Sequence, residues 1–290
     1  MDKKMVGAAA LILALVMAAG SFACAGEIGF STGMVGDGGD LVGRLDGLLI
    51  GIDAGHQAHG NSAQEAIAPG SHKTKAKVST GTTGNYTKIP EHVVNLQVAL
   101  LLRDALEKEG AKVKMVRESA DVDISNIERA QMMNDAGADL VLRIHCNSAG
   151  GPEPCGTELY VRSKGAKAEE SYRAAQAILP AMIEATRAKS RGIEKNDSYT
   201  GLNWSEVPSI LVEMGFMSNP QEDPLLVRPD YQAKLVAGMV EGIARYFEKG
   251  EAPEASEASE ASEAPEAPEA PEASEASASQ SPEALGSIGE

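Results

Sequence analysis

The chain has 290 residues and a formal net charge of −16, from 42 acidic and 26 basic side chains. Eleven of the glutamates lie in residues 251–290, which contain no Lys or Arg, so residues 1–250 carry a net charge of only −5. Nucleic-acid binding needs a clustered basic surface. The composition therefore excludes nucleic acid as a partner and says little about the surface that meets a substrate.

Residues 1–25 have the pattern of a secretory signal peptide. Lys3 and Lys4 are followed by an apolar run from Ala8 to Ala19, and Ala23-Cys24-Ala25 is a small-residue cleavage site. We expect this segment to be removed, so that the mature chain is exported to the cell wall or secreted and keeps no stable membrane span.

Two alternatives to a cleaved signal peptide remain open. The first is a membrane anchor, for which the apolar run is short. The second is a lipoprotein that keeps and acylates Cys24, for which Ser21 and Phe22 are unfavourable neighbours. Either alternative would hold the chain at a membrane.

The remaining chain divides by composition into three parts. Residues 26–46 are rich in Gly and Asp and are expected to form a flexible lead-in. Residues 250–290 repeat Glu-Ala-Ser and Glu-Ala-Pro, with too little apolar surface to offset the entropy of ordering, and we expect a disordered acidic tail. Residues 47–249 are long enough for one domain with an ordinary core.

Within this domain, short apolar segments alternate with segments of helical periodicity. The expected strands are 48–53, 112–117, 139–145, 157–161 and 209–213. The expected helices are 90–109, 125–136, 168–187 and 231–247. This alternation predicts an α/β domain with a mainly parallel sheet flanked by helices. In such sheets, functional sites gather at the carboxyl ends of the strands.

Two features interrupt this pattern. Residues 57–88 are polar, with breakers at Pro69-Gly70 and Gly81–Gly84, and we expect a long loop without secondary structure. A loop of this length inside a compact domain is usually functional. Pro180 lies inside the expected helix 168–187 and predicts a kink or a break there.

Two of the apolar segments lead directly to a histidine. The run Ile50–Ala54 is followed by Gly55 and His56, and Leu140–Ile144 is followed by His145. Catalytic zinc usually takes three protein ligands and leaves a fourth position for water. We therefore expect one zinc ion, held by the two histidines and a third residue.

Position alone does not fix the third ligand. Glu91 lies in the first turn of the helix after the long loop, where the helix dipole also favours a carboxylate for structural reasons. His92, its neighbour, is a competitor. His59 and His72 lie in the expected loop and are expected to be solvated.

Glu213 ends the apolar segment 209–213, where a carboxylate is costly to bury without a partner. A zinc hydrolase needs a group that takes a proton from water. Glu213 is the candidate for this role, and a structural ion pair is the alternative.

Three more polar residues lie beside the two histidines. Asp53 could orient His56, although a turn residue at a strand end is an equal alternative. Arg143 precedes His145 by two residues and should share its face of the strand, where it could bind a substrate carboxylate or form a structural ion pair. Asn147 is a second candidate for a contact with the substrate.

Cleavage after Ala25 would leave two cysteines, Cys146 and Cys155. Export permits a disulfide between them, and the alternative is two free thiols, one of them packed beside His145. We do not expect Cys146 to bind zinc, because its side chain should point to the opposite face of the strand from His145.

Four separated motifs share a family pattern. They are Ile52-Asp53-Ala54-Gly55-His56, Pro90-Glu91-His92-Val93-Val94-Asn95-Leu96, Arg143-Ile144-His145-Cys146-Asn147-Ser148 and Val212-Glu213-Met214-Gly215-Phe216-Met217-Ser218-Asn219. In this order and spacing, over about residues 48–247, they resemble the zinc-dependent N-acetylmuramoyl-L-alanine amidases of the type-3 amidase family. Each motif alone is weak, but four in order are specific.

The resemblance implies an α/β core with a six-stranded sheet, zinc held by His56, Glu91 and His145, and Glu213 as the catalytic carboxylate. It implies that peptidoglycan is the substrate, cut at the amide between the lactyl group of N-acetylmuramic acid and L-alanine of the stem peptide. Zinc would lower the pKa of its bound water toward about 7 and polarise the carbonyl, and Glu213 would move the water proton to the leaving amine.

This chain departs from the family pattern in two ways. Cys146 stands where many relatives have Ala, and the 290 residues contain no separate wall-binding repeats, which leaves wall targeting open. Two other functions remain: a zinc peptidase acting on other stem-peptide bonds, and a non-catalytic wall-binding protein. The second should lack a ligand or the catalytic glutamate, and all four residues are present.

Overall fold

A computed structural model of the protein describes residues 43–250, with side chains to residue 248. The signal peptide expected at residues 1–25, most of the lead-in expected at 26–46 and the acidic tail from residue 251 lie outside the described residues. Residues 43–46 of the expected lead-in lie inside them, and Leu45 is fully buried in the apolar core with its N–H donating to the carbonyl oxygen of Glu109. The domain expected at residues 47–249 lies inside the described residues.

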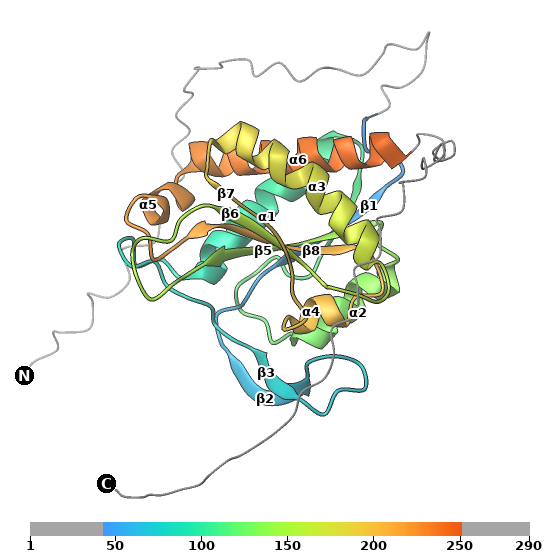
Figure 1. Cartoon of the computed structure of the whole chain (residues 1–290), viewed down its shortest axis with the longest axis horizontal. Coiled ribbons are helices and arrows are strands. Elements are labelled where there is room, and N and C mark those ends of the chain that lie inside the picture. Colours follow the sequence, from blue (N-terminus) through green and yellow to red (C-terminus); the bar gives the residue numbers. More distant parts are fainter. Residues whose placement is uncertain (1–42, 251–290) are drawn as a thin grey trace, which may run out of the picture. The chain divides into compact units, whose positions relative to one another are not determined.

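Six strands form one sheet at the centre of this domain, in the order β4-β1-β5-β8-β6-β7 (Figure 1). Their bounds are β1 (Leu49–Ala54), β4 (Lys112–Met115), β5 (Leu140–Asn147), β6 (Thr157–Val161), β7 (Ser190–Lys195) and β8 (Ser209–Phe216). All neighbouring strands are parallel except β6 and β8, which are antiparallel. The predicted α/β fold with a mainly parallel, six-stranded sheet is confirmed.

Helices cover both faces of the sheet (Figure 1). One face packs against α1 (Glu91–Lys108), α3 (Ala168–Thr186) and α6 (Pro229–Gly250), and holds the larger apolar core. The other face carries α2 (Asn126–Ala136) and the short α4 (Thr200–Asn203), with smaller apolar clusters. A further short helix, α5 (Glu222–Leu226), follows β8.

The alternation of side chains along β5 separates the core from the functional face. Leu140, Leu142 and Ile144 belong to the larger core with α1, α3 and α6, whereas Val141 packs in the small cluster on the α2 side. Successive side chains of a strand point to opposite faces. Arg143 therefore lies on the α2 side, together with the other odd-numbered residues of β5.

Residues 57–88 are not structureless, contrary to expectation. They contain β2 (Asn61–Ala66) and β3 (Thr74–Val78), which pair as an antiparallel hairpin outside the main sheet. The segments Asn-Ser-Ala-Gln-Glu-Ala and Thr-Lys-Ala-Lys-Val are largely exposed, so neither shows the apolar alternation that identifies a half-buried strand. The edge strand β7 was missed for the same reason.

Two local predictions for helices had different outcomes. The capping box of Ser125 and Glu128 is present at the start of α2. Of the kink or break expected at Pro180, the break is wrong, because α3 continues through it as one helix from Ala168 to Thr186. Pro180 is exposed while Ile178 and Met182 are fully buried, so packing of the apolar face holds the helix together.

In the described part of the chain, every helix is too short or too polar to cross a membrane.

Candidate metal centre

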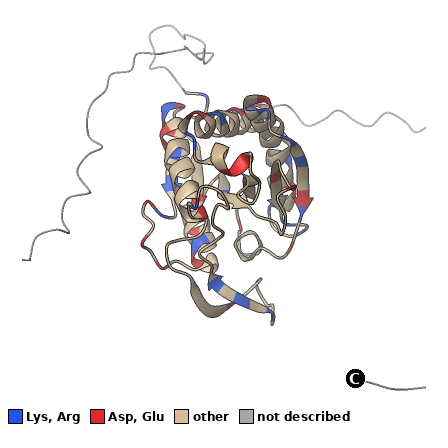
Figure 2. Cartoon of the chain, turned by 90° about the vertical axis from the view of Figure 1, so that its left-hand side faces the viewer, with Lys and Arg blue, Asp and Glu red and all other residues tan. Residues whose placement is uncertain are grey.

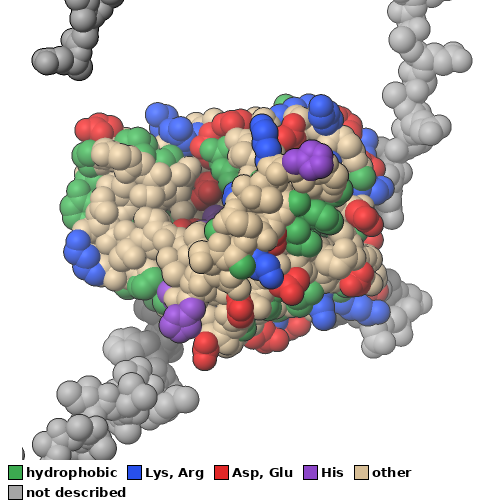
Figure 3. Space-filling model, turned by 90° about the horizontal axis from the view of Figure 1, so that it is seen from below, with side chains coloured by type: hydrophobic (Ala, Val, Ile, Leu, Met, Phe, Trp, Pro, Cys, Tyr) green, Lys and Arg blue, Asp and Glu red, His purple; other side chains and the backbone are tan. Residues whose placement is uncertain are grey.

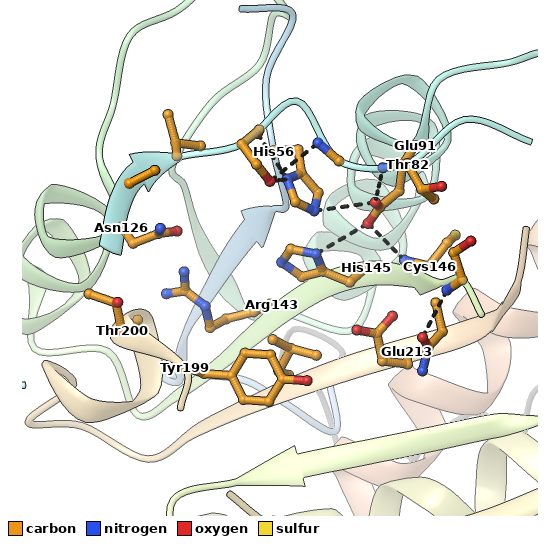
Figure 4. Close-up of a pocket in the computed structure, with 18 of the residues that line it drawn as sticks. His56, Thr82, Glu91, Asn126, Arg143, His145, Cys146, Tyr199, Thr200 and Glu213 are labelled. Atoms are coloured by element: carbon orange, nitrogen blue, oxygen red, sulfur yellow. Dashed lines mark hydrogen bonds and ion pairs between the residues drawn. The ribbon is translucent and has the colours of Figure 1, made fainter. Parts of the chain in front are cut away.

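Three side chains that are far apart in the sequence converge at one edge of the sheet. His56 follows β1, Glu91 is the first residue of α1, and His145 lies near the end of β5. Strands β1 and β5 are parallel neighbours that align Ala54 with Ile144, so their carboxyl ends bring the two histidines together. One nitrogen or oxygen atom from each of the three residues lies within 4.8 Å of the other two (Figure 4).

The Glu91 carboxylate is the centre of this cluster. Its Oε2 lies 3.2 Å from His56 Nε2, and its Oε1 lies 3.2 Å from His145 Nδ1. The backbone N–H groups of Thr82 and Cys146 also donate to it, at 2.9 and 3.1 Å. Burial opposes ionisation of Glu91, but the two histidines hold its pKa well below the usual range. The carboxylate is therefore charged and fixed from several sides.

His56 adopts a left-handed backbone conformation with φ of 60°, which is uncommon for a residue other than glycine. Its Nδ1 lies 2.9 Å from the carbonyl oxygen of Ser79. Because a carbonyl only accepts, Nδ1 carries a proton, which leaves Nε2 as the ring nitrogen that faces Glu91 and could bind a metal. This hydrogen bond selects the tautomer that a metal ligand needs.

Two buried arginines hold the turn that carries His56. Arg129 donates to the carbonyl oxygens of Ala54 and His56, and Arg117 donates to those of Ala54 and Gly55. Burial lowers the pKa of Arg117 to about 10. Carbonyls at this strand end, which lack sheet partners, are thereby satisfied, and the unusual conformation of His56 is supported by its surroundings.

Asp53 does not orient His56, contrary to one of our expectations. Its carboxylate pairs with Arg129 at 2.7 Å and with Arg143 at 2.9 Å, and all three side chains are buried. These ion pairs keep the pKa of Asp53 well below the usual range despite burial. Asp53 therefore supports the site through the two arginines.

Two glycines leave room for the cluster. A Cβ atom on Gly55 would lie 2.2 Å from Cε1 of His145, so the imidazole occupies the space that a side chain would fill. Gly81 has a φ of +79°, and a Cβ atom there would lie 2.6 Å from Oε2 of Glu91. Both positions require the absence of a side chain.

Glu213 lies in β8 directly beside His145 of β5, as its register partner. It is 8% exposed, and its Oε2 has no hydrogen-bond partner among the described residues. The neighbouring carboxylate in β6, Glu158, is paired with Arg191, and no such cation is paired with Glu213 in the described chain. Burial, followed by the charges of Glu91 and Glu158, raises the pKa of Glu213 well above its ordinary value. A structural ion pair therefore does not explain this carboxylate.

A cavity of about 360 Å³ opens over the cluster. Its lining includes the three clustered residues and Glu213 at one end, and Asn126, Arg143 and Thr200 farther along, with Tyr199 in the wall (Figure 4). Figure 3 looks onto this side of the molecule and shows a hollow with acidic and histidine side chains inside. The site is thus open to a ligand from solvent.

The two residues expected to contact the substrate both line this cavity. Arg143 is buried and paired with Asp53, and Asn147 accepts a hydrogen bond from the backbone N–H of Ser148 through its own Oδ1. The two cysteines, Cys146 and Cys155, are free thiols, and Cys146 is buried in the larger core.

The competing histidines do not join the cluster. His92 lies outside the three-residue group, and burial, followed by the charge of Arg117, lowers its pKa. His59 and His72 are exposed, as expected. Of the five histidines, only His56 and His145 contribute to the group found in the described residues.

Sequence reasoning missed the residues that fix the ligands. Asn95 donates to both Glu91 Oε1 and the carbonyl oxygen of Gly55, and its spacing of four residues from Glu91 on one helix was a usable signal. Ser79 and Thr82 gave no signal, because their contacts depend on how the hairpin and the following loop fold over the sheet.

Comparison with known proteins gives one family. A family model described as N-acetylmuramoyl-L-alanine amidase matches residues 50–245. The germination-specific N-acetylmuramoyl-L-alanine amidase of Bacillus subtilis is 34% identical over 181 residues, which cover 57% of this chain and 75% of that protein.

Solved structures agree with this match. The N-acetylmuramyl-L-alanine amidase Ami1 of Mycobacterium smegmatis superposes with a TM-score of 0.64 at 25% identity, covering 71% of this chain and 99% of that one. An N-acetylmuramoyl-L-alanine amidase of Clostridium difficile gives a TM-score of 0.59 at 28% identity, covering 69% and 97%. With its fold, its four ordered motifs and these matches, the chain belongs to the N-acetylmuramoyl-L-alanine amidase family of peptidoglycan hydrolases.

Proposed function

We propose that this chain hydrolyses the amide between the lactyl group of N-acetylmuramic acid and L-alanine of the stem peptide, using one zinc ion at His56, Glu91 and His145, with Glu213 as the base. Family membership supports the choice of bond. One observation carries the mechanism: the buried, unpaired Glu213 carboxylate lies beside His145 at the end of the cavity that holds the cluster.

The donor set fits zinc. Two imidazole nitrogens and one carboxylate oxygen are common zinc ligands, and three protein ligands leave a position for water or substrate. The His56 tautomer and the charged state of Glu91 are those that a metal ligand requires. Zinc bound here would supply positive charge that polarises the scissile carbonyl and lowers the pKa of a water molecule.

Glu213 is placed to move the proton. Its carboxylate, which lines the cavity, would accept a proton from the attacking water and return it to the leaving amine of L-alanine. The raised pKa of the carboxyl group favours its holding a proton between these two steps. Glu213 is 8% exposed and lines the cavity, so a ligand can reach it, and no cation of the described chain pairs with it.

The residues around the ligands would keep them in place during turnover. Glu91 is held by the N–H groups of Thr82 and Cys146 and by Asn95, and His56 by Ser79. Preorganised ligands and a preorganised base reduce the rearrangement needed to reach the transition state.

The direct test is digestion of purified peptidoglycan by the purified protein, with and without a chelator, followed by mass spectrometry of the products. We expect released peptides with free L-alanine amino termini, lost on chelation and restored by zinc. Cleavage at other stem-peptide bonds would instead show a zinc peptidase, and the absence of any new ends would show a non-catalytic wall-binding protein.

We also propose that the chain works outside the cytoplasmic membrane, because its family acts on the cell wall and residues 1–25 have a signal-peptide pattern. N-terminal analysis of the protein recovered from culture medium or wall tests this. A mature chain beginning at Gly26 agrees with the proposal. An acylated Cys24 would show a lipoprotein, and an intact N-terminus would contradict signal cleavage.

A further inference from the structure

Arg143 differs from the two other buried arginines near the site in how its guanidinium is used. Arg117 and Arg129 each donate to several carbonyl oxygens and so have a structural role. Within the described residues, Arg143 has one partner, the Asp53 carboxylate at 2.9 Å, and Arg129 shares that carboxylate. Arg143 thus keeps donors that no group in the described part of the chain uses.

Arg143 and Arg129 share one carboxylate, that of Asp53. Asp53 and Glu65 are the acidic groups that act on the charge of Arg143, and Arg129 is the basic one. Burial lowers the pKa of Arg143, with Asp53 opposing this effect. Because two guanidinium groups share the Asp53 carboxylate, a further anion beside Arg143 would add to its stabilisation.

The free side of Arg143 faces the cavity. The guanidinium lies between Asn126 and Thr200, at the end of the cavity away from Glu213 (Figure 4). The backbone of Gly201 covers it from one side, since a Cβ atom there would lie 2.0 Å from Cζ of Arg143. The hydroxyl of Thr200 is buried and has no hydrogen-bond partner among the described residues. A charged fork and an unused hydroxyl thus line the same end of the cavity.

The distance between Arg143 and the metal cluster indicates which group of a bound substrate lies beside Arg143. Arg143 and His145 are two residues apart on β5, so their Cα atoms are about 7 Å apart. An extended peptide spans about 3.3–3.6 Å per residue. When the nitrogen of the first stem-peptide residue lies at the cluster, the second residue reaches Arg143.

We propose that Arg143 and Thr200 bind a carboxylate on the second residue of the stem peptide, so that the enzyme prefers substrates in which this carboxylate is free over those in which it is an amide. The proposal rests on the proposed function. An Arg fork and a hydroxyl both donate to a carboxylate, whereas an amide presents one acceptor and repels the guanidinium with its own donors.

Lysines on the hairpin provide a contrast to this buried site. Lys73 and Lys75 are exposed and Lys77 is half-buried, all on or beside β3, and Figure 2 shows basic residues on this hairpin. Lys75 lines the cavity but is exposed, so salt in the solvent screens its charge. We therefore expect Lys75 not to discriminate between substrates that differ in one group. Lys75→Gln is therefore a matched control for the loss of one positive charge.

The experiment compares two synthetic substrates. One is N-acetylmuramoyl-L-alanyl-D-glutamate with a free α-carboxylate, and the other carries the carboxamide at that position. We expect the wild-type kcat/KM to be about 10–100-fold higher for the free acid, the effect of a charge-assisted hydrogen bond. Arg143→Gln should remove this preference by slowing the acid substrate, with the amide substrate changed less than about threefold and zinc content unchanged.

Two further variants separate geometry from charge. Gly201→Ala keeps every charge but displaces the guanidinium, and should also reduce the preference. Lys75→Gln at physiological salt should leave the preference within about twofold of wild type. Arg143→Gln leaves Asp53 paired with Arg129, so we expect it to fold, and its melting curve checks this.

Equal wild-type rates on the two substrates would overturn the proposal, as would a preference that survives in Arg143→Gln. If a variant fails to fold, the wild-type comparison alone still decides. If the protein cuts neither substrate, the proposed function fails separately. Binding of the dipeptides L-Ala-D-Glu and L-Ala-D-isoglutamine to the zinc-loaded protein then tests Arg143, with tighter binding of the free acid as the supporting result.

Discussion

The two ends of the cavity are built differently. At the metal end, Glu91 and His56 are each held by more than one hydrogen bond, and Gly55 and Gly81 leave no spare space around the cluster. At the other end, Arg143 has one ionic partner and Thr200 has an unused hydroxyl. An end whose candidate ligands are fixed suits chemistry that needs a defined geometry, whereas an end with unused donors suits recognition of a substrate group.

The largest expected effect is at the metal end. Glu213→Gln keeps the shape of the side chain but removes the base, and we expect kcat to fall by at least about 10²–10⁴-fold, the usual contribution of a general base. Zinc content, measured by elemental analysis, should stay near that of wild type. Activity within tenfold of wild type would exclude Glu213 as the base.

The next effect concerns the support that both ends share. Asp53→Asn leaves two buried guanidinium groups without their carboxylate, and we expect a loss of about 3–5 kcal/mol in the free energy of unfolding at pH 7. Because the folded-state pKa of Asp53 is lowered, its contribution is present above the unfolded value of about 3.9 and is lost as pH falls below it.

Urea unfolding measured from neutral pH to below pH 4 checks both parts of this prediction. The variant should be less stable at pH 7, and the difference from wild type should shrink as the solution becomes more acidic. A difference that stays constant through that range would contradict the assigned ion pairs.

A smaller effect is expected from the positioning of Glu91. Asn95→Ala removes donors to Glu91 and to the carbonyl oxygen of Gly55, and we expect zinc affinity to fall by about 10–100-fold. Competition with a chelating dye measures this, and Leu101→Ala, which changes an exposed residue of the same helix, is the control. Equal zinc affinity in the two variants would show that Asn95 only packs.

The smallest effect is expected at the end of the cavity that holds Arg143 and Thr200. Thr200→Val has nearly the same shape and removes a buried hydroxyl without a partner, so the folded protein should be unchanged or stabilised by about 1 kcal/mol. The preference for the free-acid substrate should fall by about three- to tenfold. Thermal unfolding and paired kinetics measure both, and a clear destabilisation would mean that the hydroxyl has a structural partner.

Much of the metal end could be predicted from the sequence. His56, His145 and Glu213 follow or end apolar segments, and parallel strands bring such ends to one edge of the sheet. Glu91 was one of two candidates by position, because a first-turn carboxylate has a structural explanation as well. Its convergence with both histidines decided between Glu91 and His92.

The supports of the site could not be predicted in the same way. Arg117 and Arg129 look like surface residues in the sequence, yet both are buried because backbone carbonyls of the His56 turn need donors. The hairpin of β2 and β3 carries no apolar pattern, since both strands are largely exposed. The supports of the His56 turn depend on contacts between segments more than 20 residues apart, as in the 23-residue separation of His56 and Ser79.

The most direct test of the central claim is mass spectrometry of peptidoglycan digested by the wild-type protein, by Glu213→Gln and by wild type with a chelator. We predict free L-alanine amino termini on the released peptides for wild type alone, with both other samples inactive and zinc still bound in the variant. New ends at any other bond, or unchanged activity after complete metal removal, would contradict it.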